Sequence, residues 1–292
     1  MKRRRVLITG AAGFLGTSVV QQFRETDFDV IGVARSSHRN SGFMEIDFSD
    51  GEAINVLDSL SDIDVIIHLA SHVDFSRQAS MDDFRATNHD AVIALTDIAI
   101  KNQSHIVFVS GSLVCGEKTF ISANSEISPE LPYAKAKRSA ERLFGEYLGP
   151  LTVLRPCGIF GYPGPRHLGI NTAIAEAIET QRLPTCYGSG GARRNYIFVE
   201  DLARAIRFVV VNGIVGTHFV SGSERLTIFE MLELISKTFI DRDAEVQMRA
   251  GGVSRDMIVE PSETLPEART FFEALLEIRE SLNVYRVEIS SL

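Results

Sequence analysis

Residues Val6–Phe23 read VLITGAAGFLGTSVVQQF: a short apolar run enters a glycine-rich turn and continues into a stretch whose apolar residues have helical spacing. The three glycines are spaced G-x-x-G-x-x-G, a variant of the more familiar G-x-G-x-x-G. Glycines in such a turn let the backbone approach a pyrophosphate, which the first amides of the following helix then face. The stretch therefore predicts a dinucleotide-binding turn. The residues expected to contact the cofactor here are Gly10, Gly13, Phe14, Leu15 and Gly16.

The end of the second predicted strand bears on which dinucleotide binds. In dinucleotide-binding strand–helix–strand units, an acidic residue about 20 positions past the glycines holds the ribose 2′-hydroxyl. Here the strand ends instead on Arg35, and Arg35, Ser36 and Arg39 could bind a 2′-phosphate. NADP(H) is therefore favoured over NAD(H), unless Arg35 is only a solvated loop charge. Asp47 and Phe48 are placed for the adenine edge, or alternatively for capping and core packing.

Strand-like and helix-like segments alternate along the chain, without a low-complexity linker. That rhythm is typical of an α/β fold, a Rossmann-type doubly wound parallel sheet. After about Gly161 the alternation becomes less regular. We therefore expect a dinucleotide-binding domain at 1–165 and a smaller C-terminal substrate-binding lobe at 166–292, with about 195–220 returning to the first domain. The expected strands are Val6–Thr9, Val30–Ala34, Val65–Leu69, Ile106–Ser110 and Thr152–Leu154.

Two predicted helices, Met81–Asn102 and Tyr133–Leu148, each carry an apolar stripe. Such stripes pack on a sheet, and they can also pair across a dimer. A third helix, Glu267–Ser281, is expected to be structural. The stripe residues are Phe84, Ala91, Leu95, Ile98 and Ala99 in the first helix, and Ala136, Ala140, Leu143, Phe144 and Tyr147 in the second.

Composition excludes several classes of function. Acidic side chains outnumber basic ones, 38 to 30, for a formal charge of −8, which argues against a nucleic-acid surface. No apolar segment is long enough to cross a bilayer, and the basic run Lys2–Arg5 leads into a short strand rather than a signal-peptide core. Cys115, Cys157 and Cys186 are few, odd in number and widely spaced. They suggest a reducing compartment, hence the cytoplasm, with neither a disulfide framework nor a metal site.

Tyr133 and Lys137 lie four residues apart at the start of a predicted helix, so both side chains share one face. An unperturbed phenol, with a pKa of about 10, is too weak an acid to serve as a general base at neutral pH. A nearby ammonium lowers that pKa by favouring the phenolate. Alone, a Y-x-x-x-K pattern is common. Downstream of a dinucleotide-binding turn, it indicates a proton-transfer pair.

Five segments together resemble the extended short-chain dehydrogenase/reductase superfamily, in its NAD-dependent epimerase/dehydratase family. The resemblance covers about residues 5 to 240. It implies a Rossmann-type sheet for the nicotinamide cofactor, a C-terminal lobe for a substrate that is most often a nucleotide-activated sugar, and a homodimer formed through the two striped helices. The segments are the glycine turn, HLAS at His68–Ser71, Tyr133-x-x-x-Lys137, LRPCGIFG at Leu154–Gly161 and RRNYIFVEDLARAI at Arg193–Ile206.

The resemblance also implies residue roles. Tyr133 resembles the tyrosine that transfers a proton, and Lys137 the lysine that lowers its pKa and bonds the nicotinamide ribose. Further cofactor contacts are implied at Leu69, Ala70 and Ser71.

For the substrate, Arg194 falls where enzymes of this family that act on nucleotide sugars place an arginine on the substrate's diphosphate, a task suited to a bidentate guanidinium. An ion pair with Asp201 or Glu200 is the alternative. Asn171 is of a type that holds a sugar diphosphate, and Arg255 is a further candidate for a phosphate contact.

The chain departs from the family pattern at Gly111. Counted back from Gly116, the catalytic Ser or Thr falls on this glycine, which has no hydroxyl. Loss of such a donor usually lowers the rate on the order of a hundred- to a thousandfold. Either a neighbouring serine takes its place, with Ser112 favoured over Ser110, or the reaction is slow or absent.

The same segment limits the reaction. The family's 4,6-dehydratases carry an Asp-Glu pair where this chain has Ser112 and Leu113, so dehydration is disfavoured. We expect epimerisation at a sugar carbon or reduction of a 4-keto group by hydride transfer, and Arg35 favours net reduction. Two alternatives stay open. An NADP(H)-dependent reductase of an apolar ketone or aldehyde would have no role for Arg194, and a catalytically weakened nicotinamide-binding regulator would explain Gly111.

Overall fold

The computed structural model of the chain describes residues 3–24, 26, 28–36, 42–241, 243, 245–252 and 254–290, with only the backbone described at 53, 54, 58 and 283–290. A seven-stranded parallel sheet forms its centre, in the order β12-β7-β5-β4-β1-β2-β3. The chain winds outward from β1 in both directions, which confirms the expected Rossmann-type α/β fold. All five expected strands are present within a residue or two of their expected bounds. The strands are β1 (Arg4–Thr9), β2 (Phe28–Ala34), β3 (Met44–Glu45), β4 (Val65–His68), β5 (His105–Val109), β7 (Leu151–Pro156) and β12 (Gly216–Val220).

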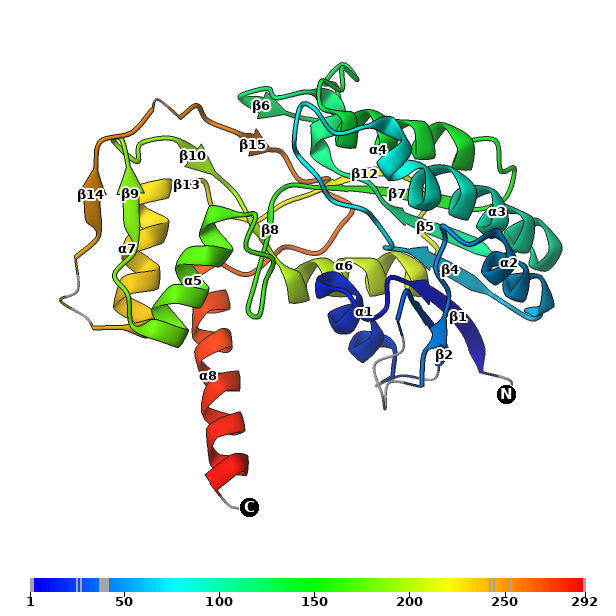
Figure 1. The fold of residues 1–292 in the computed structure, drawn as a ribbon, viewed down its shortest axis with the longest axis horizontal. Coiled ribbons are helices and arrows are strands. Elements are labelled where there is room, and N and C mark those ends of the chain that lie inside the picture. The colour runs from blue at the N-terminus through cyan, green and yellow to red at the C-terminus, as the bar shows by residue number, and fades with distance from the viewer. Residues whose placement is uncertain are drawn as a thin grey trace.

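Helices cover both faces of the sheet (Figure 1). The helices α1 (Phe14–Arg24) and α6 (Val199–Asn212) pack together on one face, and α3 (Ala91–Asn102) and α4 (Pro132–Phe144) pack together on the other. The inner strands β1, β4 and β5 are nearly all buried, as expected where helices cover both faces of a parallel sheet. Two apolar cores result, one on each side of the sheet. Short helical segments complete this half: α2 (Gly51–Ile54), η1 (Asn55–Ser59), η2 (Met81–Phe84), η3 (Ala86–Asp90) and η4 (Ser112–Cys115).

The two striped helices differ from expectation in their bounds. The first is divided into η2, η3 and α3, although its stripe is buried as expected. The second, expected over Tyr133–Leu148, ends at Phe144, because Gly145 caps it and the chain then turns toward Pro150. Tyr147 therefore lies beyond the helix, where its hydroxyl donates to the Ser104 carbonyl at 2.6 Å.

The C-terminal lobe is built from α5 (Gly169–Thr180), α7 (Ile228–Phe239) and α8 (Phe271–Ser290), which share an apolar core. Figure 1 shows α8 extending away from the rest of the molecule. This helix begins at Phe271 rather than at the expected Glu267, because Thr270 and Glu273 form a reciprocal capping box. Paired short strands complete the lobe and its links to the sheet: β6 (Phe120–Ile121) with β15 (Ile258–Val259), β8 (Ile159–Phe160) with β11 (Ile197–Phe198), β9 (Thr185–Tyr187) with β14 (Gln247–Arg249), and β10 (Arg193–Arg194) with β13 (Leu226–Thr227).

Candidate functional site

The glycine turn lies between β1 and α1, at the carboxyl end of the sheet. Gly10 has a φ of +69°, and a Cβ there would lie 2.8 Å from the Ala70 nitrogen, so only glycine fits. A Cβ on Gly16 would overlap the carbonyl oxygen of Gly10. Since α1 begins at Phe14, its first amides lack partners within the helix and can bind an anion. The turn fits the pyrophosphate of a dinucleotide.

The side chain of Thr9 joins the end of β1 to the end of β4. Its hydroxyl accepts from the amides of Leu69 and Ala70, both at 3.2 Å, and lies 2.7 Å from His68 Nδ1. Burial lowers the pKa of His68 to about 3, so the ring is neutral. His68 Nε2 lies 2.9 Å from the Thr87 carbonyl and must donate to it, which leaves Nδ1 to accept from Thr9. Residues 69 and 70 are thus held against the glycine turn.

Arg35 and Asp47 lie at the outer edge of this region. Arg35 and Ser36 are exposed at the end of β2, and Arg39 falls outside the described residues. Asp47 accepts hydrogen bonds from the amide and hydroxyl of Ser49, and these bonds, together with the charge of Arg35, lower its pKa. Phe48 is buried in the core on the α3 side of the sheet.

Tyr133 and Lys137 lie one turn apart on α4, which begins at Pro132. Lys137 Nζ is buried, donates to the Val109 carbonyl at 3.0 Å and lies 6.0 Å from the centre of the Tyr133 ring. Burial lowers the pKa of Lys137 to about 7 and raises that of Tyr133 to about 12. Burial is the largest influence on the pKa of Tyr133, and the expected lowering by Lys137 is not among its causes. The protein by itself keeps the phenol protonated at neutral pH.

Aromatic side chains surround the phenol, and the sequence analysis did not identify them. The ring of Phe75 lies 5.0 Å from that of Tyr133, and Phe84 lies 6.2 Å away. His167, from the loop after β8, lies 5.3 Å from Phe75. Only the position of Phe75, four residues after the HLAS segment, could have suggested a place near the site.

The segment around Gly111 leaves the sheet immediately after β5. Gly111 has an extended backbone, with φ −174° and ψ 151°, and η4 begins at Ser112. The Ser110 hydroxyl is buried and has no hydrogen-bond partner among the described residues. It lies toward the carboxylate of Glu141, which is one turn beyond Lys137 on α4. Ser112 is also buried. Ser110 is therefore directed toward the buried pair of Glu141 and Arg155, whose two hydrogen bonds measure 2.9 and 2.7 Å.

Arg194 makes neither of the ion pairs considered as an alternative to substrate binding. Within the described chain, Asp201 pairs with Arg204 and Arg269, and Glu200 accepts from Ser18. The guanidinium of Arg194 instead donates to the carbonyls of residues 193 and 255 and to the hydroxyl of residue 254. Its charge therefore has no carboxylate partner among the described contacts.

Two other candidate substrate residues have well-defined partners. Asn171 is buried, and its amide bonds the Gly161 amide and the carbonyls of Ile159 and Pro165. It thereby fixes the loop before α5, so a substrate contact at Asn171 stays a prediction. Arg255 Nη2 lies 3.3 Å from Glu117, which also pairs with Arg77.

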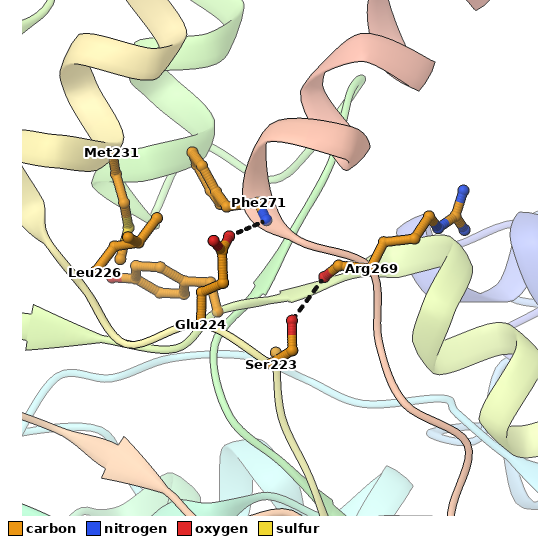
Figure 2. A pocket seen from close by; sticks show the side chains of 8 residues that line it. Ser223, Glu224, Leu226, Met231, Arg269 and Phe271 are labelled. Carbon is orange, nitrogen blue, oxygen red and sulfur yellow. Dashed lines mark hydrogen bonds between the residues drawn. The ribbon is translucent and has the colours of Figure 1, made fainter.

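Two hollows lie elsewhere in the molecule, and Phe84 lines the larger of them. One, between the segment after β12 and the start of α8, holds about 10 Å³, room for one water molecule at most. Figure 2 shows Glu224 there, accepting from the Phe271 amide at 2.7 Å, and Ser223 donating to the Arg269 carbonyl. The other, about 400 Å³, lies between η2, η3 and α4. Neither is lined by Tyr133, Lys137 or the glycine turn.

Two other kinds of feature are absent from the described residues. These residues contain no group of three or more potential metal ligands from His, Cys, Asp and Glu. They also contain no helix long and apolar enough to cross a membrane. The three cysteines carry free thiols.

Comparisons with known proteins agree with this geometry. The profile of the NAD dependent epimerase/dehydratase family matches residues 6–222. The chain is 28% identical to a dTDP-glucose 4,6-dehydratase of Neisseria meningitidis, over 80% of this chain and 75% of that protein. It is 30% identical to the low-salt glycan biosynthesis protein Agl12 of Haloferax volcanii, over 75% of this chain and 76% of that protein. The solved structure of a UDP-glucuronic acid 4-epimerase from Bacillus cereus in complex with NAD superposes with a TM-score of 0.76 at 20% identity, covering 93% of this chain and 96% of that one.

Proposed function

The chain belongs to the NAD dependent epimerase/dehydratase family, and on that premise we propose that it is an NAD(P)-dependent enzyme acting on a nucleotide-activated sugar. The reaction we propose is epimerisation at a sugar carbon or reduction of a 4-keto sugar, with Tyr133 as the acid/base. Dehydration is not proposed, because Ser112 and Leu113 carry no carboxylate. The observation that carries the proposal is the Tyr133 and Lys137 pair on α4, held by the Val109 carbonyl at the end of β5, at the same carboxyl edge of the sheet as the glycine turn.

The residues of the chain divide the chemistry among them. A nicotinamide ring bound here would supply or accept the hydride. Tyr133 holds its proton at neutral pH, so it can give that proton to a substrate oxygen as the hydride arrives. Lys137 is held by the Val109 carbonyl next to the phenol, where its charge favours the phenolate that remains. The rings of Phe75 and Phe84 lie 5.0 and 6.2 Å from the phenol ring.

The substrate class rests on Arg194. A guanidinium held by backbone carbonyls, without a carboxylate partner among the described residues, keeps its charge available to a diphosphate. Asn171 holds the loop beside this region and is proposed as a weaker substrate contact.

A thermal-shift titration tests the substrate class without knowledge of the reaction, since a ligand that binds the folded state raises the unfolding midpoint. The ligands are NADPH, NADH and a panel of UDP-, GDP-, CDP- and dTDP-sugars. We expect one nucleotide family to add a shift that Arg194→Ala removes and that the neighbouring exposed Arg193→Ala retains. Cofactor binding with no nucleotide-sugar shift would refute the assignment.

For the cofactor we propose NADP(H) over NAD(H). Arg35 is exposed at the end of β2, where a 2′-phosphate would lie, and its charge is near the single carboxylate of Asp47. The similar B. cereus epimerase has NAD in its structure, so a direct comparison is needed. We expect Arg35→Ala to weaken NADPH binding about tenfold and NADH binding by less than twofold in calorimetric titrations. Tighter binding of NADH by the unmodified protein would overturn the preference.

We also propose a homodimer formed through η2, α3 and α4, and the cytoplasm as its compartment. Met81, Ile93 and Ile100 are apolar and 47%, 45% and 61% exposed, and the last two lie two turns apart on α3. Replacing both isoleucines with glutamate should convert a dimer into a monomer in sedimentation equilibrium. A monomeric unmodified protein at micromolar concentration would refute the dimer.

A catalytically weakened nicotinamide-binding protein is the second candidate, and Gly111 is the observation that favours it. Cofactor binding with no turnover of any sugar in the panel, and activity gained by Gly111→Ser, would support that candidate.

A further inference from the structure

The ammonium of Lys137 lies over the ring of Phe108, a contact that the proposed reaction leaves without a role. Lys137 Nζ is 5.0 Å from the centre of that ring, closer than the 6.0 Å that separate it from the centre of the Tyr133 ring. Phe108 lies on β5 and is fully buried. A cation within about 6 Å of an aromatic ring is attracted by the negative potential of the ring face. The strand β5 therefore supplies an electrostatic partner for the lysine.

A buried ammonium needs such a partner, because removal from water disfavours its charge. Lys137 is buried, and it donates to the Val109 carbonyl at 3.0 Å. Glu141, one turn along α4, makes its hydrogen bonds to Arg155 and a neighbouring guanidinium instead. Glu141 therefore acts on the ammonium through its charge alone. The direct contacts that favour the charged form come from the Val109 carbonyl and the Phe108 ring.

The ring of Phe108 is held by its neighbours. The imidazole of His68 stacks on it, with ring centres 5.7 Å apart and planes 20° apart. The ring of Phe144 on α4 lies 5.1 Å away. His68 is itself fixed, because its two ring nitrogens lie 2.7 Å from the Thr9 hydroxyl and 2.9 Å from the Thr87 carbonyl. These contacts hold the ring beneath the ammonium before any ligand binds.

Other charged or titratable groups surround the lysine on three elements. A change confined to the ring of Phe108 leaves all of them in place, so a change in the ionisation of Lys137 can be assigned to the ring. The groups are Tyr133, Arg138 and Glu141 on α4, His68 on β4 and Arg155 on β7.

We propose that Phe108 is a positioning residue of the active site, whose ring face keeps Lys137 charged beside Tyr133. The inference rests on the proposed function for the use of that charge, which favours the phenolate left by proton transfer. Burial lowers the pKa of Lys137 to about 7, so the ammonium is close to losing its proton at neutral pH. A further fall of about one pH unit would reduce the charged fraction at pH 7 about fivefold.

The test is the ionisation of Lys137 in the protein without cofactor, followed by NMR of lysines labelled with carbon-13 at the ε position. The resonance is assigned by its loss in Lys137→Met. Phe108 is replaced with phenylalanine analogues that carry one, two or three ring fluorines. Fluorine withdraws charge from the ring face and changes its shape little, so the attraction weakens stepwise. We expect the pKa of Lys137 to fall with each fluorine, by about one pH unit with three.

Phe144 provides the matched control, since its ring lies in the same core and has no described contact with Lys137. The same fluorines at Phe144 should leave the pKa of Lys137 unchanged. A constant pKa across the Phe108 series would overturn the proposal, as would equal shifts from the two positions.

The titration needs neither cofactor nor sugar, so its outcome is separate from that of the proposed function. A protein that turns over no nucleotide sugar but shows the graded shift would lose the proposed function and keep the role of Phe108 in holding the charge. A protein that turns over a nucleotide sugar without the shift would lose this inference alone.

Discussion

Replacing Lys137 with methionine should stabilise the protein at neutral pH while abolishing its activity. Methionine has a similar length and volume without the charge. Burial lowers the pKa of Lys137 from 10.5 to about 7, whereas the unfolded chain keeps the ordinary value. That difference corresponds to about 5 kcal/mol, and it is the cost of keeping this ammonium charged in the folded state.

The sign of the effect follows from proton binding. Between pH 7 and 10.5 the unfolded chain binds more protons at this site than the folded chain, so stability rises with pH across that window. Below it, the unmodified protein bears the full cost and the variant bears none. The variant also leaves the Val109 carbonyl without its donor, which reduces the gain in the free energy of unfolding by about 1–3 kcal/mol. At pH 6 we therefore expect Lys137→Met to be more stable by about 2–4 kcal/mol.

Urea unfolding of both proteins, without cofactor, at pH 6, 8 and 10 measures this difference. The advantage of the variant should shrink as the pH rises, vanish between about pH 8 and 10, and reverse above that, because the loss of the Val109 hydrogen bond does not depend on pH. Other groups that titrate in this range are common to both proteins and cancel in the comparison. A variant less stable than the unmodified protein at pH 6, or an advantage independent of pH, would refute the reasoning.

Three further predictions concern the support of the site. Arg155→Met removes two hydrogen bonds from the buried carboxylate of Glu141 and leaves it the bond from Arg138, which should cost about 3 kcal/mol at pH 7 in urea unfolding. The pKa of Glu141 in the folded protein lies below its ordinary 4.5, so the pair stabilises the fold above pH 4.5 and this stabilisation fades as the pH falls through the folded pKa. An equal loss of stability in Arg155→Met at pH 7 and at pH 3 would contradict this. Gly16→Ala forces a Cβ onto the Gly10 carbonyl and should weaken cofactor binding more than about tenfold in calorimetry, with an unchanged circular dichroism spectrum; a loss under twofold would show that the turn can adjust. Thr227→Ala removes the capping box at the start of α7 and should lower stability by about 1 kcal/mol, whereas Thr227→Ser should retain most of it.

The sequence by itself determined the glycine turn and the helical face that Tyr133 and Lys137 share, because both depend on local chemistry. The glycine spacing after Val6–Thr9 indicates a turn that only residues without a Cβ can make, and Gly10 and Gly16 are in fact closed to a Cβ. The four-residue spacing of Tyr133 and Lys137 places both on one face of a helix, wherever that helix packs. The alternation of strands and helices and the spacing of apolar residues within them follow from the repeat of each backbone conformation, so the sheet and its helices could be predicted.

Tertiary structure decided which groups meet and in what charge state. Thr9 ties the end of β4 to β1 by accepting from the Ala70 amide, a contact between residues about 60 positions apart. Among the described residues Arg194 has no carboxylate partner, and Asp201 and Glu200 have other partners. The pKa values of Lys137 and Tyr133 are set by burial, and the ring of Phe75, from a separate loop, lies 5.0 Å from that of Tyr133. Spacing along the chain carries no information on such contacts, because desolvation and hydrogen bonding depend on what the fold brings together in space.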